Sequence, residues 1–323
     1  MKIALGILIF LLILSAVFFS IVLYCFFKIF YVREWKKKRK ASADEIEIPE
    51  GKIYEVHRET LTKWIKAART MSYKNVEITS RDGLTLRGKY YEYRPGAPIE
   101  LMLHGYRGNA ERDLSGGILR AFAIGHSVLL VDNRGAGNSD GCTSSFGVCE
   151  SEDCILWIDY ILDYIDFSAK IILTGVSMGA ATVLLAACNE NLPQNVVGVL
   201  ADCGYTSAEE IISKVITEMG LPARFVMPFV KVAAMIFGKF DLSEAAPIDI
   251  IDECRIPVIF YHGDKDKFVP YEMSVENFEK CGSEKKKLVT IEGAGHGLCY
   301  ITNPSKYIKE LKDFFAPLTA DED

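Results

Sequence analysis

The chain has 323 residues and a formal net charge of −6, and this charge is distributed unevenly. Residues 1–40 carry eight Lys or Arg and one Glu, a net charge of +7, whereas the rest carries 29 basic and 42 acidic residues, a net charge of −13. An acidic body of about 280 residues matches one domain with a single hydrophobic core. Because it has no basic stripe interleaved with aromatic residues, it is not expected to bind nucleic acid.

Nine cysteines are scattered over the chain, an odd number with no Cys-x-x-Cys pair. This spacing predicts neither a zinc site nor a disulfide framework. Most of the cysteines, such as Cys188 in an Ala/Leu-rich helix, are better interpreted as small buried apolar residues, which fits a reducing compartment. We expect no metal and no other cofactor.

The first predicted element is an apolar helix over residues 3–27, which contain no charged side chain. As an α-helix this run would be about 37 Å long, enough to cross a hydrocarbon layer of about 30 Å. The run is too long for a signal peptide, and no small-x-small cleavage site is followed by a polar start. The sequence therefore predicts a retained membrane anchor.

Basic residues flank the predicted anchor mainly on one side. Seven Lys or Arg lie within residues 28–40, whereas Lys2 alone precedes the apolar run. Positive charge is enriched on the cytoplasmic side of membrane-spanning helices. We therefore expect a single-pass membrane protein, with residues 1–40 as anchor and basic flank and the carboxyl-terminal body in the cytoplasm.

Residues 41–74 are predicted to form a polar linker followed by a short helix over 60–71. The body, residues 75–318, begins with three strands, the first two joined by the hairpin turn Arg81-Asp82-Gly83. Strands and helices then alternate. The expected strands are 75–80, 84–93, 99–103, 127–132, 170–174, 196–202, 257–261 and 287–291, and the expected helices are 150–166, 178–189, 271–280 and 305–315. This order predicts an α/β fold with a mostly parallel central sheet and helices on both faces.

The alternation is interrupted at about residues 205–247 by two helical patterns, 208–219 and 224–237. We interpret this segment as a small helical cap over one end of the sheet. The second pattern is apolar nearly all round. It is consistent either with an ordinary packed helix pair or with one wall of an acyl-binding groove.

The predicted strand 170–174 leads into Gly175-Val176-Ser177-Met178-Gly179, and a helix follows directly. Gly-x-Ser-x-Gly between a buried strand and a helix is typical of a nucleophile elbow. The turn is so tight that Gly175 and Gly179 are needed because they lack a Cβ atom. We expect it to lift the hydroxyl of Ser177 above the sheet and to direct the amide of Met178 towards a substrate oxyanion.

A serine is a weak nucleophile at neutral pH unless a positioned base accepts its proton. His296, in the Gly-rich loop after the last strand, is the expected base. The imidazole in turn needs a carboxylate to orient it. Asp264 and Asp266 both satisfy the chain order Ser, Asp, His, and Asp202 is a third candidate.

The second oxyanion donor is expected in the loop after strand 99–103, which reads His104-Gly105-Tyr106-Arg107-Gly108-Asn109. Gly105 permits a tight backbone path, and the amide of Tyr106 is the expected donor. His104 is expected to fix this loop by hydrogen bonding rather than to act in the chemistry. The other three histidines are expected to be structural.

These motifs resemble those of the α/β-hydrolase superfamily, and the chain is similar to its serine-aminopeptidase-like and acyl-hydrolase branches over residues from about 75 to 315. The family's loop pattern His-Gly-x-x-Asp-x-x-Val-Pro matches residues 262–270 and implies that Asp266 is the acid of a triad. The family's Asp-x-Arg-Gly-x-Gly-x-Ser turn matches residues 132–139, where it is usually structural. The Gly-x form of the oxyanion loop is one that the family often pairs with longer acyl groups.

The motifs and the resemblance together predict a membrane-anchored serine hydrolase that cleaves carboxylic esters or thioesters, including lipid-linked ones, through an acyl-enzyme. A first alternative is a serine peptidase of the aminopeptidase type, in which Glu209 or Glu218 would hold the free amine of the substrate. A second alternative, from another class of protein, is a binding module without catalytic activity.

Overall fold

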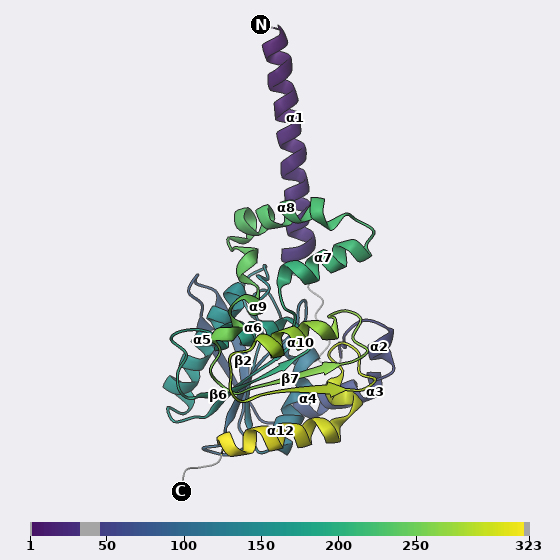
Figure 1. Ribbon diagram of the computed structural model, residues 1–323. Helices are drawn as coiled ribbons and strands as arrows, with labels where there is room; N and C mark the ends of the chain where they lie inside the picture. Colours follow the sequence, from purple (N-terminus) through teal and green to yellow (C-terminus); the bar gives the residue numbers. More distant parts are fainter. Residues whose placement is uncertain (1, 33–45, 320–323) are drawn as a thin grey trace.

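The computed structural model describes residues 2–32 and 46–319 and is built around one sheet of eight strands. The strands are β1 Lys74–Thr79, β2 Thr85–Tyr91, β3 Ile99–Leu103, β4 Ser127–Val131, β5 Ile171–Val176, β6 Val196–Asp202, β7 Val258–Gly263 and β8 Lys286–Ile291. Their order across the sheet is β1-β2-β4-β3-β5-β6-β7-β8, and Figure 1 shows the sheet in the middle of the body. β2 runs antiparallel to both of its neighbours, and all other neighbouring strands are parallel. This mostly parallel sheet confirms the predicted fold class.

Helices cover both faces of the sheet. The larger ones are α3 Arg58–Thr70, α4 Ala110–Ala123, α5 Val148–Tyr160, α6 Met178–Ala187, α10 Tyr271–Lys280 and α12 Pro304–Thr319. Successive residues of a strand point to opposite faces, so Ile171 of β5 packs with α5 and α6, whereas Ile172 packs with α12. Strands that are buried on both faces are continuously apolar, which is why these segments were recognisable in the sequence.

The helices predicted from the sequence do not include α4. Gly116 and Gly117 lie in its middle, and glycine is a poor helix former. The folded chain shows why a glycine is needed there: a Cβ atom on Gly116 would lie 2.4 Å from a ring carbon of Trp64 in α3. The close packing of α3 on α4 therefore requires a residue that is a poor helix former. For this reason the sequence contains only a weak signal for α4, the helix that joins the parallel strands β3 and β4.

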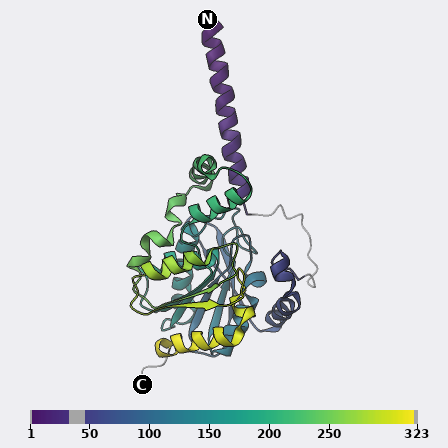
Figure 2. The same cartoon turned by 45° about the vertical axis from the view of Figure 1, so that its right-hand side comes forward.

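The predicted cap consists of α7 (Ala208–Glu218) and α8 (Ala223–Ala233), which a π-helical turn at Ala234–Gly238 extends. Figures 1 and 2 both show these helices above the sheet, beside the lower end of the helix at the amino terminus. The short helix α9 (Pro247–Ile250) then leads back towards β7. The helical cap at this place in the chain agrees with the predicted fold.

The amino-terminal helix α1 (Lys2–Cys25) projects away from the body and ends in a π-helical turn, η1 (Phe26–Phe30) (Figure 2). Within the described residues, 2–30 form the one helix that is long and apolar enough to cross a membrane. Its buried residues, Val22, Cys25, Phe26 and Phe30, all lie near its carboxyl-terminal end. Residues 33–45, with most of the predicted basic flank and part of the linker, lie outside the described residues. The domain boundaries at residues 40 and 74 stay predictions.

Candidate active site

Ser177 lies at the sharp turn between β5 and α6, at the carboxyl edge of the sheet. Its φ of 56° and ψ of −119° form a combination that a residue with a side chain rarely adopts. A Cβ atom on Gly175 would lie 2.1 Å from the carbonyl oxygen of Gly179, and one on Gly179 would lie 2.2 Å from that of Leu103. The amide of Ser177 donates to the carbonyl of Asp202 at 2.8 Å. The strained turn is thus held by close packing and by the end of β6.

The side chains of Ser177, His296 and Asp266 form a chain of hydrogen bonds. Nε2 of His296 lies 2.9 Å from Oγ of Ser177, and Nδ1 lies 2.7 Å from Oδ2 of Asp266. They come from the connections after β5, β8 and β7, which leave the sheet at the same edge because these strands are parallel. An ionised carboxylate can only accept a hydrogen bond, so Nδ1 carries the ring hydrogen and Nε2 can accept the proton of the hydroxyl.

The loop around Asp266 keeps its carboxylate ionised. Oδ1 accepts the amides of Phe268 and Val269, both at 2.9 Å, and Nε2 of His262 lies 3.3 Å from Oδ2. Burial raises the pKa of Asp266, but the hydrogen bonds from His262 and His296 outweigh it and hold the pKa well below its usual range. A negative charge is therefore available to orient the imidazole and to stabilise its protonated form.

The other two candidate carboxylates make different contacts. Asp264 is exposed, accepts the amide of Gly293 at 2.6 Å and forms an ion pair with Lys265 at 3.1 Å. Asp202 is buried and accepts the hydroxyl of Tyr307 at 3.0 Å, and burial raises its pKa. Within the described residues, neither of the two has a hydrogen bond to the imidazole of the candidate base.

The loop after β3 passes directly beside the serine, since a Cβ atom on Gly105 would lie 3.5 Å from Cβ of Ser177. Nε2 of His104 accepts a backbone amide from the loop after β4 at 3.0 Å, so Nδ1 donates to the carbonyl of Gly105 at 2.8 Å and fixes the loop. In the described part of the chain, the amides of Tyr106 and Met178 donate to no other group. Both can therefore donate to a substrate oxygen.

Two neighbours of His296 had no signal in the sequence. The hydroxyl of Tyr54, in the short helix α2 (Lys52–Glu55), donates to the carbonyl of His296 at 3.1 Å. The ring of Phe268 meets the imidazole edge to face, with 5.0 Å between the ring centroids. Helix α2 belongs to the segment that was predicted as a linker, so part of that segment packs against the site.

One group of side chains has the spacing of a metal site. Cys203, Asp266 and His296 bring three ligand atoms within 4.8 Å of one another. Burial raises the pKa of the Cys203 thiol well above its usual value, so the thiol is protonated, whereas metals bind the thiolate. The hydrogen bond between Asp266 and His296 already uses one ligand atom of each residue. These groups are therefore better suited to proton transfer than to metal binding.

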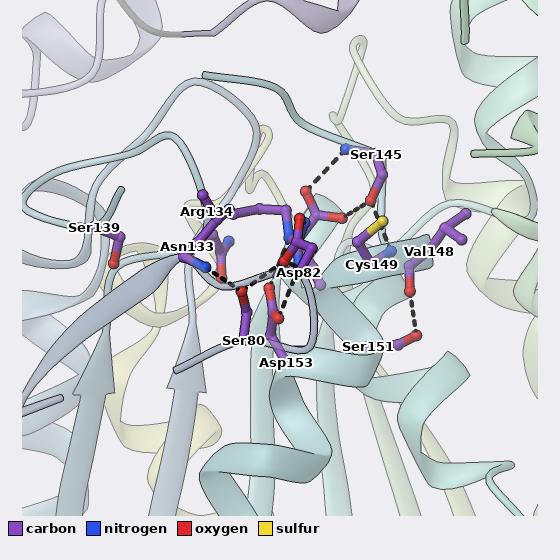
Figure 3. A network of polar contacts seen from close by, with 12 residues as sticks. Ser80, Asp82, Asn133, Arg134, Ser139, Ser145, Val148, Cys149, Ser151 and Asp153 are labelled. Carbon is purple, nitrogen blue, oxygen red and sulfur yellow. Dashed lines mark hydrogen bonds and ion pairs between the residues drawn. The ribbon is translucent and has the colours of Figure 1, made fainter. Parts of the chain in front are cut away.

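A second polar network, shown in Figure 3, braces the loops beside the site. The guanidinium of Arg134 bridges Asp82 at 3.0 Å and Asp153 of α5 at 2.8 Å. Glu150 of α5 accepts the amides of Ser145 at 2.9 Å and Gly147 at 3.0 Å. The turn at residues 132–139 and the loop at 142–147 are thus tied to α5, which agrees with a structural role for that turn.

Comparison with known proteins supports the resemblance to the α/β-hydrolase superfamily. The model of the α/β-hydrolase fold matches residues 101–227, which include the serine turn and the loop after β3. The YqkD protein of Bacillus subtilis is 28% identical over 192 residues, a match that covers 59% of this chain and 62% of that protein, less than two thirds of its length. The bem46 protein of Schizosaccharomyces pombe is 27% identical over 254 residues, covering 76% of this chain and 77% of that protein.

Solved structures share the fold. The Pyrococcus furiosus esterase Pf2001 superposes with a TM-score of 0.65 at 20% identity, covering 79% of this chain and 94% of the esterase. At this identity the superposition demonstrates a common architecture. Taken with the match of the family model over residues 101–227, it shows that the chain has the α/β-hydrolase fold.

Proposed function

We propose that the protein is a membrane-anchored serine hydrolase that cleaves carboxylic esters or thioesters. The observation that carries this proposal is the hydrogen-bonded chain from Ser177 through His296 to the ionised carboxylate of Asp266. A serine in a strained turn, a base with an acceptor nitrogen facing its hydroxyl and an orienting carboxylate are the parts that acyl transfer requires.

The reaction would proceed through an acyl-enzyme. Oγ of Ser177 attacks the acyl carbonyl while Nε2 of His296 takes the hydroxyl proton. The amides of Tyr106 and Met178 stabilise the oxyanion, and each such donor contributes about 3–4 kcal/mol to the transition state. His296 then gives the proton to the leaving alcohol or thiol. A water molecule, deprotonated by the same nitrogen, attacks the acyl carbon; the bond to Oγ of Ser177 breaks, His296 returns the proton to Oγ, and the carboxylic acid leaves.

The surroundings of the oxyanion loop support an apolar acyl group. Met227 and Val230 of α8 belong to the same buried apolar cluster as Met178, and Tyr106 packs against that cluster. Side chains of this kind favour hydrocarbon over polar substrate groups. The cap would therefore form one wall of an acyl-binding groove and would not be merely a packed helix pair.

The outer face of the cap supports a lipid-linked substrate. Phe229 of α8 contacts Phe18 of α1 with 5.4 Å between ring centroids, whereas Phe225 and Ile236 on the same segment are exposed. An exposed apolar patch beside a helix that can cross a membrane is suited to contact with a bilayer. The cytoplasmic location remains part of the proposal and follows from the basic residues at 28–40.

Two observations weigh against the alternatives. The carboxylates suggested for binding a substrate amine are already paired, Glu209 with Lys231 and Glu218 with Lys214, both at 2.6 Å. A binding module without activity would have no need for the strained serine turn, which costs stability.

The proposal is tested by comparing substrates on the full-length protein in detergent micelles. We expect hydrolysis of acyl esters and thioesters of increasing chain length to be faster than that of aminoacyl amides, and Ser177→Ala to abolish it. Ser168→Ala, in an exposed loop, is the matched control and should keep full activity. Preference for aminoacyl amides would indicate a peptidase, and full ester hydrolysis by Ser177→Ala would refute the assignment of the nucleophile.

A further inference from the structure

The end of the amino-terminal helix is bonded directly to a loop of the body. The amide of Ser144 donates to the carbonyl of Phe30, and the amide of Val32 donates to the carbonyl of Cys142, both at 2.9 Å. Between them, Tyr31 and Thr143 form an antiparallel β-bridge. Residues 30–32 therefore run along residues 142–144 as a short two-stranded pair.

Aromatic packing fixes the same segment. Phe30 is completely buried and meets Phe146 and Phe240 edge to face, with ring centroids 5.9 Å and 5.3 Å away. Phe26, one turn earlier, packs against Phe237 of the cap at 5.5 Å. Buried aromatic pairs of this geometry contribute beyond their buried area, so the helix end is a packed part of the core between cap and body.

The loop that carries the first proposed oxyanion donor is held by this helix end. The hydroxyl of Tyr106 donates to the carbonyl of Ile29, and the guanidinium of Arg107 donates to the carbonyl of Lys28 at 2.7 Å. Both carbonyls belong to the π-helical turn, whose last carbonyls have no partner within the helix. Arg107 has a φ of 54°, a left-handed conformation that persists only where surrounding contacts enforce it.

The second proposed donor is connected to the same segment through one intermediate. Oγ of Ser144 lies 3.2 Å from Sδ of Met178, while the amide of Ser144 bonds to Phe30. The loop containing Ser144 is held in turn by the carboxylate of Glu150, which contacts its hydroxyl at 3.3 Å. Figure 3 shows Ser145, the next residue of this loop, in the polar network that also contains Arg134.

We propose that residues 26–32 position the oxyanion hole, so that the end of the membrane helix is a working part of the hydrolase site as well as a tether. This inference rests on the proposed function. Its basis is that both residues whose amides would hold the oxyanion are bonded, directly or through Ser144, to one segment. The catalytic rate should then depend on this segment even when no membrane is present.

The test uses point variants of the full-length protein in detergent micelles with a short, water-soluble acyl ester. Tyr106→Phe removes only the hydroxyl that holds Ile29 and keeps the backbone amide, while Phe30→Ala loosens the helix end. We expect kcat to fall about 10- to 100-fold in both, less than the effect of losing a donor outright, with little change in KM. Leu12→Ala, whose side chain is 61% exposed on α1, is the matched control and should keep kcat.

A second readout separates positioning from a general loss of structure. A boronic acid that mimics the tetrahedral intermediate should bind more weakly in Tyr106→Phe by the same factor as kcat/KM falls, while inhibition by the product acid stays constant. Unchanged kcat in Tyr106→Phe and in folded Phe30→Ala would overturn the inference, as would a loss of kcat without weaker binding of the boronic acid. Inactivity of the unsubstituted protein would instead overturn the proposed function, and this inference with it.

Discussion

Replacement of Asp266 by asparagine should remove most of the activity while preserving the shape of the site. Oδ1 of Asp266 accepts the amides of Phe268 and Val269, and Oδ2 faces Nδ1 of His296. In Asp266→Asn the side-chain oxygen would stay with the two amide donors, so the NH₂ group would face the imidazole. The ring would then carry its hydrogen on Nε2, which could no longer accept the proton of Ser177.

The expected loss in kcat is about 10⁴-fold, the effect of a wrong tautomer in such a triad, which corresponds to about 5.5 kcal/mol of transition-state stabilisation. Hydrolysis of a short acyl ester in micelles measures it. Asp264→Asn is the matched control, because this carboxylate is exposed and bonds to Gly293 and Lys265; its activity should stay near that of the unsubstituted protein. Full activity in Asp266→Asn, or loss of activity in Asp264→Asn, would refute the reasoning.

Two further predictions concern the core and the membrane surface. Glu100→Gln should lower the free energy of unfolding at pH 7 by about 3–5 kcal/mol, because it leaves Arg120 buried without its partner. Burial raises the pKa of Glu100, but Arg120 and His126 outweigh it and hold the pKa at about 2, below the usual value for a glutamate. The carboxylate therefore stabilises the fold above about pH 4.5 and less as the pH falls towards 2. Denaturant titrations should therefore show that the difference in unfolding free energy between Glu100→Gln and the unsubstituted protein shrinks as the pH falls. A difference that stays constant with pH would contradict this. Brominated phospholipid in vesicles should quench the fluorescence of the tryptophan in Phe225→Trp, on the exposed face of α8. It should not quench that of the control Phe167→Trp, which is exposed before β5 at the opposite edge of the sheet. Equal quenching of both would exclude a cap that contacts the bilayer.

The architecture could be predicted from the sequence because its signals are local. Continuous apolar runs such as 171–176 mark strands buried on both faces. The chain order then places the residues that follow β5, β7 and β8 at one edge of the sheet. This is how Ser177 and His296 could be selected before the fold was known, with Asp264 and Asp266 as candidate acids, and the structure brings Ser177, His296 and Asp266 within hydrogen-bond distance of one another.

The choice between the two carboxylates of the loop after β7 could not be made from local sequence signals. Chain order leaves Asp264 and Asp266 equivalent, and the loop pattern shared with the family implied the second. The structure gives the physical difference: the amides of Phe268 and Val269 turn the Asp266 side chain inwards, while Asp264 turns outwards to Lys265. Such a difference of direction within one loop is set by backbone geometry that residue types alone do not specify.

Contacts between distant segments account for the features that were missed. The need for a glycine at position 116 of α4 is apparent only once Trp64 packs against it. Tyr54 reaches His296 across 242 positions of sequence. The apolar run at residues 3–27 predicts a membrane helix equally well with or without a docked end, because a side chain such as that of Phe26 contributes to hydrophobicity in both cases. The part of the site formed by residues 26–32 therefore became apparent only in the fold.

The most direct test of the central claim is to locate the residue modified by a fluorophosphonate. The reagent phosphonylates a serine that is activated by a neighbouring base, and mass spectrometry of peptides from the labelled protein identifies that serine. We predict a single adduct on Ser177 of the folded, full-length protein and none on Ser177→Ala. An adduct that persists in Ser177→Ala, or the absence of any adduct on the folded protein, would contradict a nucleophile at the turn between β5 and α6.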